Sequence, residues 1–219
     1  MISEKTITKR QFLRTCACAA GVLAVSGLPK RLAGSSFSVN SISPSSEKLW
    51  KWSKEMTYYI ETPRGLKCLV CPNACVLVED GQESICKNKV VKDGKLYTIA
   101  YGNPCSVHVD PIEKKPLFHF LPTTMAYSLA TAGCNFACLN CQNWEISQTS
   151  PKKTVNGDLM PVAVVQECVN NACRSIAYTY SEPVAFFEYA RDTARLAKAR
   201  GLKNVWISNG YINEKPLRD

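Results

Sequence analysis

Short apolar runs alternate with segments of helical periodicity in the second half of the chain. The runs at 126–130, 176–180 and 204–208 are predicted to be strands. Between them, apolar residues recur at helical spacing over 161–173 and over a stretch that ends at Arg200, which predicts two helices. Because strands that alternate with helices pair in parallel through right-handed crossovers, the pattern predicts an α/β fold with a parallel sheet.

The second of these helices carries signals at both ends. Ser181 is the predicted N-cap, Pro183 lies in the first turn, and Gly201 stops the helix. The apolar stripe that would face the sheet consists of Phe187, Ala190, Ala194 and Ala197.

A different pattern precedes position 123. Strand-like runs at 76–78 and 96–100, together with a turn at 92–94, predict a small loop-rich unit of hairpins. A serine-rich stretch without periodic pattern comes before it and predicts a linker. The predicted regions are an export-signal-like N-terminus at 1–34, the linker at 35–55, a Cys-rich small domain at 56–122 and an α/β unit at 123–219.

The N-terminal segment has the layout of an export signal. Lys9, Arg10 and Arg14 precede an apolar run at 16–28. The segment resembles a twin-arginine signal, except that Lys9 stands in place of the first arginine. An uncleaved amphipathic N-terminus is the alternative, because the run is short for a transmembrane helix. The protein is therefore expected in the cytoplasm or, through this signal, outside it, and a membrane contact is expected only here.

The net charge of +9 does not indicate a polyanion partner. Six basic residues and one acidic residue fall within the first 34 positions, and the remaining excess is spread thinly along the chain. Binding to nucleic acid is therefore not expected.

Seven of the twelve cysteines form two tight clusters, which favours metal binding over a disulfide scaffold. Cys134, Cys138 and Cys141 have the spacing C-x3-C-x2-C on a loop directly after a predicted strand. Three thiolates on one short loop can each bind one iron of a 4Fe–4S cluster and leave the fourth iron open. The alternative is a structural zinc site, but it needs a fourth ligand, and neither His108 nor His119 is adjacent to the loop.

The earlier cluster has four cysteines with the spacing C-x2-C-x3-C-x10-C, namely Cys68, Cys71, Cys75 and Cys86. Zinc and an auxiliary iron–sulfur cluster both fit four thiolates, and two disulfides are a third option if the chain is exported. The other five cysteines are interpreted as small buried hydrophobic residues, with Cys105 as the candidate exception; they are Cys16, Cys18, Cys105, Cys168 and Cys173.

Two further candidate residues follow the second and third predicted strands. Glu182 and Asn209 would lie with the cysteine loop at the carboxyl ends of parallel strands, where such sheets build active sites. Each has a simpler alternative, because Glu182 would also favour the helix dipole and Asn209-Gly210 is a common turn.

Two segments without assigned chemistry lie between the clusters. The stretch 110–116 mixes acidic and basic residues with prolines and predicts a rigid, solvated turn. His119 lies in the apolar run 117–121, and this position predicts that its side chain is hydrogen-bonded in the core.

The chain as a whole resembles the radical S-adenosylmethionine (radical SAM) superfamily, and within it the pyruvate formate-lyase activating enzyme-like proteins and the AmmeMemoRadiSam system radical SAM enzymes. The cysteine loop matches the signature C-x3-C-x-aromatic-C, except that Asn140 replaces the aromatic residue, which leaves the packing of the adenine edge in question. The resemblance extends from about 65 to 212, and the segments that carry it are 68–75 with Cys86, 110–120, 141–147 and 178–183.

This resemblance implies a fold and a chemistry. The fold would be a partial (β/α) radical SAM barrel, truncated after about three strands. The enzyme would cleave S-adenosylmethionine reductively at the 4Fe–4S cluster to generate a 5′-deoxyadenosyl radical, with Glu182 and Asn209 as cofactor-binding residues. An activase-like reaction and a reductant such as ferredoxin or flavodoxin are implied, whereas the substrate, protein or small molecule, is left open. The rival interpretations are an iron–sulfur electron-transfer protein and a structural zinc protein.

Overall fold

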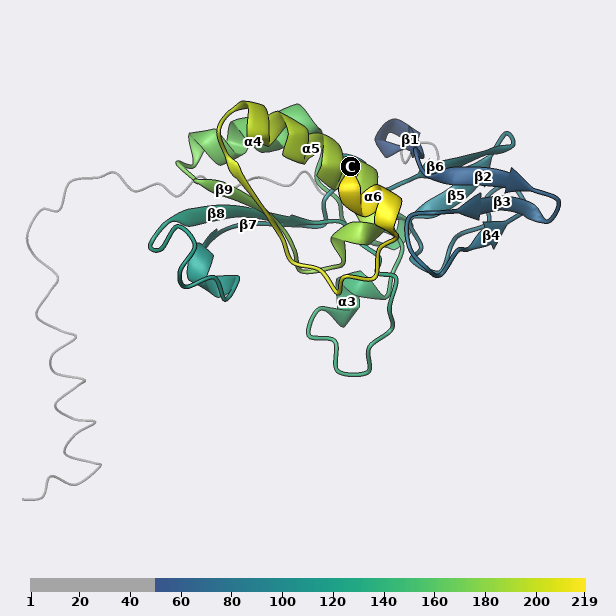
Figure 1. Ribbon diagram of the computed structural model, residues 1–219, viewed down its shortest axis with the longest axis horizontal. Coiled ribbons are helices and arrows are strands. Elements are labelled where there is room, and N and C mark those ends of the chain that lie inside the picture. Colours follow the sequence, from purple (N-terminus) through teal and green to yellow (C-terminus); the bar gives the residue numbers. More distant parts are fainter. Residues whose placement is uncertain (1–49) are drawn as a thin grey trace, which may run out of the picture. The chain divides into compact units, whose positions relative to one another are not determined.

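The computed structural model describes residues 50–219 (Figure 1). The predictions for the export-signal-like segment 1–34, including Cys16 and Cys18, and for most of the linker lie outside the described residues. Among the helices of residues 50–219, none is long and apolar enough to cross a membrane.

The first part of the described chain consists of two small antiparallel sheets. One has the strand order β1-β6-β5 and the other β2-β3-β4. The bounds are η1 (Trp50–Trp52), β1 (Lys54–Glu55), β2 (Tyr59–Thr62), β3 (Gly65–Cys68), β4 (Val76–Leu77), β5 (Lys89–Lys92) and β6 (Lys95–Thr98). The predicted turn is confirmed: Asp93 and Gly94 join β5 to β6 with φ angles of 49° and 71°, as a tight hairpin requires.

A four-stranded sheet follows, with the order β10-β9-β8-β7. The strands are β7 (Ser106–Pro111), β8 (Met125–Ala130), β9 (Ser175–Tyr178) and β10 (Lys203–Trp206). The predicted parallel pairing of the last three strands is confirmed, whereas β7, which the sequence did not predict, runs antiparallel to β8.

Two helices cover one face of this sheet, α4 (Pro161–Asn170) and α5 (Phe187–Ala199), as Figure 1 shows. Their apolar side chains pack against Tyr127, Leu129, Ile176 and Tyr178, which point to that face from β8 and β9. The predicted stripe of α5 is confirmed, since Phe187, Ala190 and Ala197 are buried and Ala194 is packed against the core. The short elements are η2 (Ile112–Lys114), α3 (Trp144–Ser147), η3 (Pro151–Lys153), η4 (Pro183–Phe186) and α6 (Glu214–Arg218).

The beginning of the second helical segment differs from the prediction. Ser181 is not the N-cap, because its hydroxyl donates to the carbonyl of Thr131 in the loop after β8. Glu182 caps η4 instead, and its carboxylate accepts a hydrogen bond from the backbone N–H of Val184 at 3.0 Å. Gly201 ends α5 with a φ of 75°, as predicted.

Two predictions for the segment 110–120 are wrong. The stretch 110–116 is not a solvated turn. Asp110 lies in the last part of β7 and is buried together with Lys115, and the Nζ of Lys115 lies 2.7 Å from the carboxylate of Asp110. The phenol of Tyr180 also donates to Asp110, so the buried charges are paired and hydrogen-bonded. His119 is exposed rather than part of the core, and the neighbouring Phe118 is 63% exposed.

The two small sheets share their hydrophobic core with the segment that follows β9. Leu66, Leu77 and Leu96 from their strands form one cluster with Val184 and Phe187 of η4 and α5. The Cys-rich part is therefore held against the segment that follows β9, which brings the two cysteine clusters to neighbouring positions.

Candidate metal centre

The loop after β8 carries the three cysteines of the later cluster. Cys134 and Cys141 are partly buried, and Cys138 is exposed. Burial raises the pKa of Cys134 to about 11; the backbone N–H of Phe136 opposes this rise, and the nearby groups Glu182, Cys138 and Cys141 add to it. The structure therefore gathers the three predicted cluster ligands in one neighbourhood, together with Glu182.

The thiols do not form a closed metal cage as they stand. No group of three or more His, Cys, Asp or Glu side chains within residues 50–219 is arranged to hold an ion. The fold fixes the backbone around the thiols, whereas rotation about the Cα–Cβ bond redirects each sulfur. A soft thiolate set on a partly exposed loop fits an iron–sulfur cluster in donor type and access.

Asn135 connects the cysteine loop to two other parts of the site. Its side-chain N–H donates to the carbonyl of Tyr211 at 3.0 Å, and its side-chain oxygen accepts from the amide of Asn209 at 2.9 Å. Its backbone carbonyl accepts from the side chain of Asn73 at 2.9 Å. Asn135 is 4% exposed, so these bonds are made out of water and hold the loop in place.

Glu182 binds the segments that follow β9 and β10 to each other. One carboxylate oxygen accepts from the hydroxyl of Ser208 at 2.7 Å in addition to the N–H of Val184, and the other accepts from the backbone N–H of Asn209 at 2.8 Å. Glu182 is 5% exposed, and its carboxylate accepts three hydrogen bonds from other groups of the chain. A carboxylate accepts about four hydrogen bonds, so one acceptor position is left for a further donor.

Gly133 lies where the cysteine loop meets the Cys-rich part. Its φ is 99°, and a Cβ at this position would lie 2.3 Å from the carbonyl oxygen of Cys86 and 2.5 Å from Oδ1 of Asn88. Only glycine allows this approach. The two cysteine clusters are therefore joined by close backbone packing.

The earlier cluster also comes together in the fold. Its four members are free thiols that line one small cavity; they are Cys68, Cys71, Cys75 and Cys86. Burial raises the pKa of Cys68 to about 12, and Lys89 is the main group that opposes this rise. The four residues thus line one cavity, together with the buried side chain of Lys89.

Three residues of this region were not found by sequence reasoning. Asn135 lies between two cysteines of the motif, which was the only signal that it might matter. Lys89 and Glu188 form a buried ion pair beside the earlier cluster. No signal in the sequence marks either residue, since an isolated lysine and a helical glutamate are usually solvated.

The remaining described cysteines are separate from both clusters. Cys168 and Cys173 are buried, as predicted. Cys105 is partly buried, and its thiol donates to the carbonyl of Ala130 at 3.6 Å, which places it near the end of β8.

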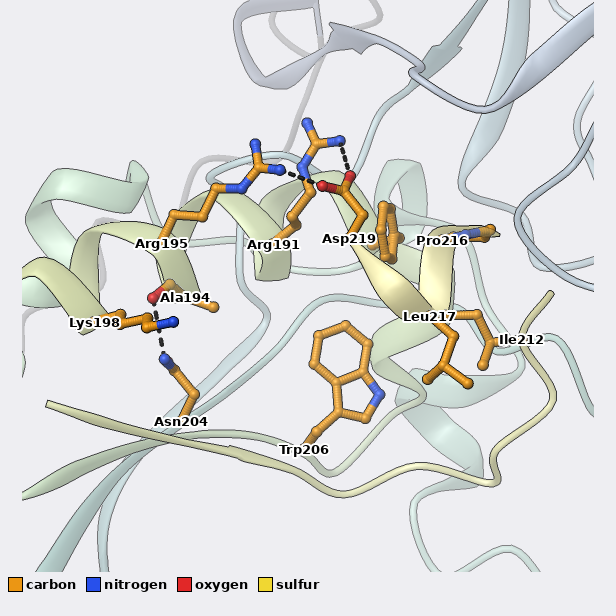
Figure 2. Close-up of a pocket in the computed structure, with 11 residues that line it drawn as sticks. Arg191, Ala194, Arg195, Lys198, Asn204, Trp206, Ile212, Pro216, Leu217 and Asp219 are labelled. Carbon is orange, nitrogen blue, oxygen red and sulfur yellow. Dashed lines mark hydrogen bonds and ion pairs between the residues drawn. The ribbon is translucent and has the colours of Figure 1, made fainter. Parts of the chain in front are cut away.

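A hollow much larger than the cavity of the earlier cluster lies away from both cysteine clusters. It has a volume of about 600 Å³ between α5, β10 and α6, and no described cysteine lines it. Figure 2 shows Trp206 and Leu217 in this hollow, with Arg191 and Arg195 both directed to Asp219. Its cations are thus partly neutralised by Asp219.

Comparison with known proteins supports an iron–sulfur protein. Residues 124–219 match the family described as "4Fe-4S single cluster domain", and this range contains the loop with Cys134, Cys138 and Cys141. An uncharacterized protein of Methanocaldococcus jannaschii is 44% identical over 153 residues, which are 70% of this chain. The chain spans about half, 46%, of the length of that relative. No solved structure matches the chain.

Proposed function

We propose that the protein is a radical SAM enzyme in which Cys134, Cys138 and Cys141 hold a 4Fe–4S cluster and S-adenosylmethionine binds the open iron. The observation that carries this proposal is the meeting of three loops at the carboxyl ends of β8, β9 and β10. The cysteine loop, Glu182 and Asn209 come from these three loops and are joined by hydrogen bonds. When bound, the reduced cluster supplies the electron that breaks a carbon–sulfur bond of S-adenosylmethionine and yields a 5′-deoxyadenosyl radical.

The chain's own residues have distinct tasks in this proposal. The three thiolates hold the cluster, and exposure of Cys138 leaves the loop open to a cofactor from solvent. Asn135 holds the loop against the ends of the neighbouring strands. Glu182 offers its remaining acceptor position to the methionyl ammonium, for which a buried carboxylate is a strong partner.

A reductant of low potential, such as ferredoxin or flavodoxin, belongs to this proposal, and the reaction is activase-like in class. The match to a 4Fe–4S domain supports the cluster, and the family resemblance of the sequence supports S-adenosylmethionine. The substrate that receives the radical is left open.

The experiment is anaerobic reconstitution of the protein with iron and sulfide, followed by reduction and addition of S-adenosylmethionine. We expect 5′-deoxyadenosine as a product and a changed electron paramagnetic resonance spectrum on cofactor binding. Cys138→Ala should abolish both signals, and Cys105→Ala is the matched control because its thiol lies near the same sheet edge without belonging to the motif.

Each alternative result would support a different function of the protein. Iron and sulfide bound with a spectrum indifferent to S-adenosylmethionine would identify an electron-transfer protein with a fourth protein ligand. If the Cys105→Ala variant then gained a response to the cofactor, Cys105 would be that ligand. Zinc alone at Cys134, Cys138 and Cys141 would identify a structural zinc protein.

A further inference from the structure

The four cysteines of the earlier cluster surround a single small cavity. Turns of the chain bring them together: the N–H of Cys68 donates to the carbonyl of Cys75 at 2.9 Å, and the N–H of Ala74 donates to that of Cys71 at 3.1 Å. Cys86 joins them from the loop before β5. The free space among them is about 10 Å³, which is room for one small ion.

A buried ammonium group shares the wall of this cavity. Lys89, the first residue of β5, lines it together with the four cysteines, and its Nζ lies 2.8 Å from the carboxylate of Glu188 in α5. The two side chains are 2% and 0% exposed. Lys89 therefore lies next to the thiols, whereas Glu188 does not line the cavity.

Stability alone does not explain this ion pair. Removing two charges from water is expensive, and well-packed apolar side chains of similar volume are often as stable or more so. The second carboxylate oxygen of Glu188 also has no hydrogen-bond partner among residues 50–219. A buried lysine beside four cysteines is instead suited to a centre whose thiolates give it a net negative charge.

We infer that Cys68, Cys71, Cys75 and Cys86 bind one zinc-type divalent ion and that Lys89, held in place by Glu188, is the buried counter-charge of this centre. Four thiolates are a preferred ligand set of structural zinc, and they leave two negative charges in excess of a divalent ion. The ammonium of Lys89 offsets part of that excess inside the protein. The centre would link the turns around 68–75 to the loop before β5, and metal binding of this kind contributes to folding stability.

The four sulfurs must turn toward the ion, because no described group of three ligands is arranged to hold it as it stands. A change of χ1 rotamer redirects a cysteine sulfur without moving the backbone. The backbone turns and the shared cavity are the parts of the site that the fold fixes.

The test uses the full chain with Cys134, Cys138 and Cys141 all replaced by Ala, so that only the earlier cluster can bind metal. Its failure is therefore distinct from failure of the radical SAM proposal. We expect one Zn²⁺ per chain, and Co²⁺ should give the absorption of a tetrahedral thiolate site. Cys75→Ser should remove or weaken binding. Absence of zinc binding, or binding of iron with sulfide in its place, overturns the inference.

The role of Lys89 is tested by competition for Zn²⁺ with a coloured chelator. The double variant Lys89→Met/Glu188→Gln removes both charges together, and we expect zinc affinity to fall at least tenfold. The matched control is Lys95→Met/Glu55→Gln, an exposed ion pair in the same sheet, which should leave the affinity unchanged.

A single variant keeps the test decisive if the double variant fails to fold. Glu188→Gln keeps a side-chain oxygen that accepts from the ammonium of Lys89 and so still holds it in place, but it removes the negative charge behind it. Zinc affinity should therefore be equal to or greater than that of the unmodified protein. Lower affinity in Glu188→Gln, or unchanged affinity in a folded double variant, shows that Lys89 is not the counter-charge.

Discussion

The carboxylate of Glu182 accepts a hydrogen bond from the backbone N–H of Asn209 at 2.8 Å. The two residues that the sequence marks as candidate cofactor ligands thus hold each other, one after β9 and the other after β10. Whatever either residue does for a cofactor, it also fixes the spacing of two loops at the sheet edge.

Glu182→Gln should weaken binding of S-adenosylmethionine and leave the iron content unchanged. No thiolate is touched, but the charge that attracts an ammonium is lost, which is worth roughly 1.5 to 3 kcal/mol. Titration of the reduced protein with S-adenosylmethionine, followed by electron paramagnetic resonance, measures affinity and cluster content in one sample.

The matched control is Ser208→Ala, which removes one hydrogen bond from the same carboxylate without changing its charge. If Ser208→Ala weakens cofactor binding as much as Glu182→Gln does, Glu182 acts only by positioning the loops. Loss of iron in Glu182→Gln would contradict the separation of the carboxylate from the cluster ligands.

Cys138→Ala should remove the iron–sulfur cluster and leave the metal at Cys68, Cys71, Cys75 and Cys86 in place. Cys138 is exposed and does not line the cavity of the earlier cluster, so its loss affects one centre only. Metal and sulfide analysis of the purified variant checks this, with Cys105→Ala as the control. If both centres are empty in Cys138→Ala, the seven cysteines share one centre.

The main strands of the sheet were predictable because β8 and β9 are buried runs and all three strands alternate with helical segments, and such alternation is visible in the local sequence. Only Val205 of β10 is buried. The strand β7 was missed because its one buried residue is the charged Asp110, so it contains no buried apolar run. Asp110 pairs with Lys115, which follows the strand, and charged residues usually indicate solvent. Here they are buried as a pair, and the pair forms only in the folded chain. The error at His119 has the opposite cause, since its apolar neighbour Phe118 is itself exposed.

The cysteines of the site were predictable from their spacing, but their surroundings were not. Asn135 bonds to Asn73, Asn209 and Tyr211, which are 62 to 76 positions away in the sequence. No local pattern encodes contacts of that kind. The same holds for Lys89 and Glu188, which are 99 positions apart.

Gly133→Ala should destabilise the protein by about 2 kcal/mol or more and reduce its iron content. A methyl group would meet the carbonyl of Cys86 at 2.3 Å, and the φ of 99° adds backbone strain. Denaturant unfolding gives the change in free energy. The matched control is Gly81→Ala, where φ is 82° but no atom lies within 4 Å of the added carbon, so only the strain of about 1 to 2 kcal/mol is expected. Equal losses in the two variants would mean that the close approach has no effect.

The buried pair of Asp110 and Lys115 should make stability fall in acid. Burial alone would raise the pKa of Asp110, but hydrogen bonds from Lys115, Tyr180 and Lys114 outweigh it and lower that pKa below the usual range. Burial lowers the pKa of Lys115 in spite of the pair. Since the folded pKa of Asp110 lies below the unfolded value of about 3.9, its contribution is fully present above that pH and is lost as pH falls toward the folded value.

Asp110→Asn should therefore flatten the decline of unfolding free energy below about pH 4 and cost about 3 kcal/mol at neutral pH, because Lys115 is left buried without its partner. Urea unfolding at a series of pH values measures both effects. Glu55→Gln in the exposed pair with Lys95 is the control and should change stability by less than about 1 kcal/mol. An unchanged acid decline in Asp110→Asn would assign it to other carboxylates.

The contact of Gly133 with the carbonyl oxygen of Cys86 couples the maturation of the two cysteine sites. The loop that receives iron and the backbone around Cys86 can adopt their final paths only together. If zinc sets the position of Cys86, cells starved of zinc should accumulate chains that incorporate iron poorly even when iron and sulfide are plentiful. A poorly loaded preparation would then reflect the supply of one metal during biosynthesis rather than a shortage of the other.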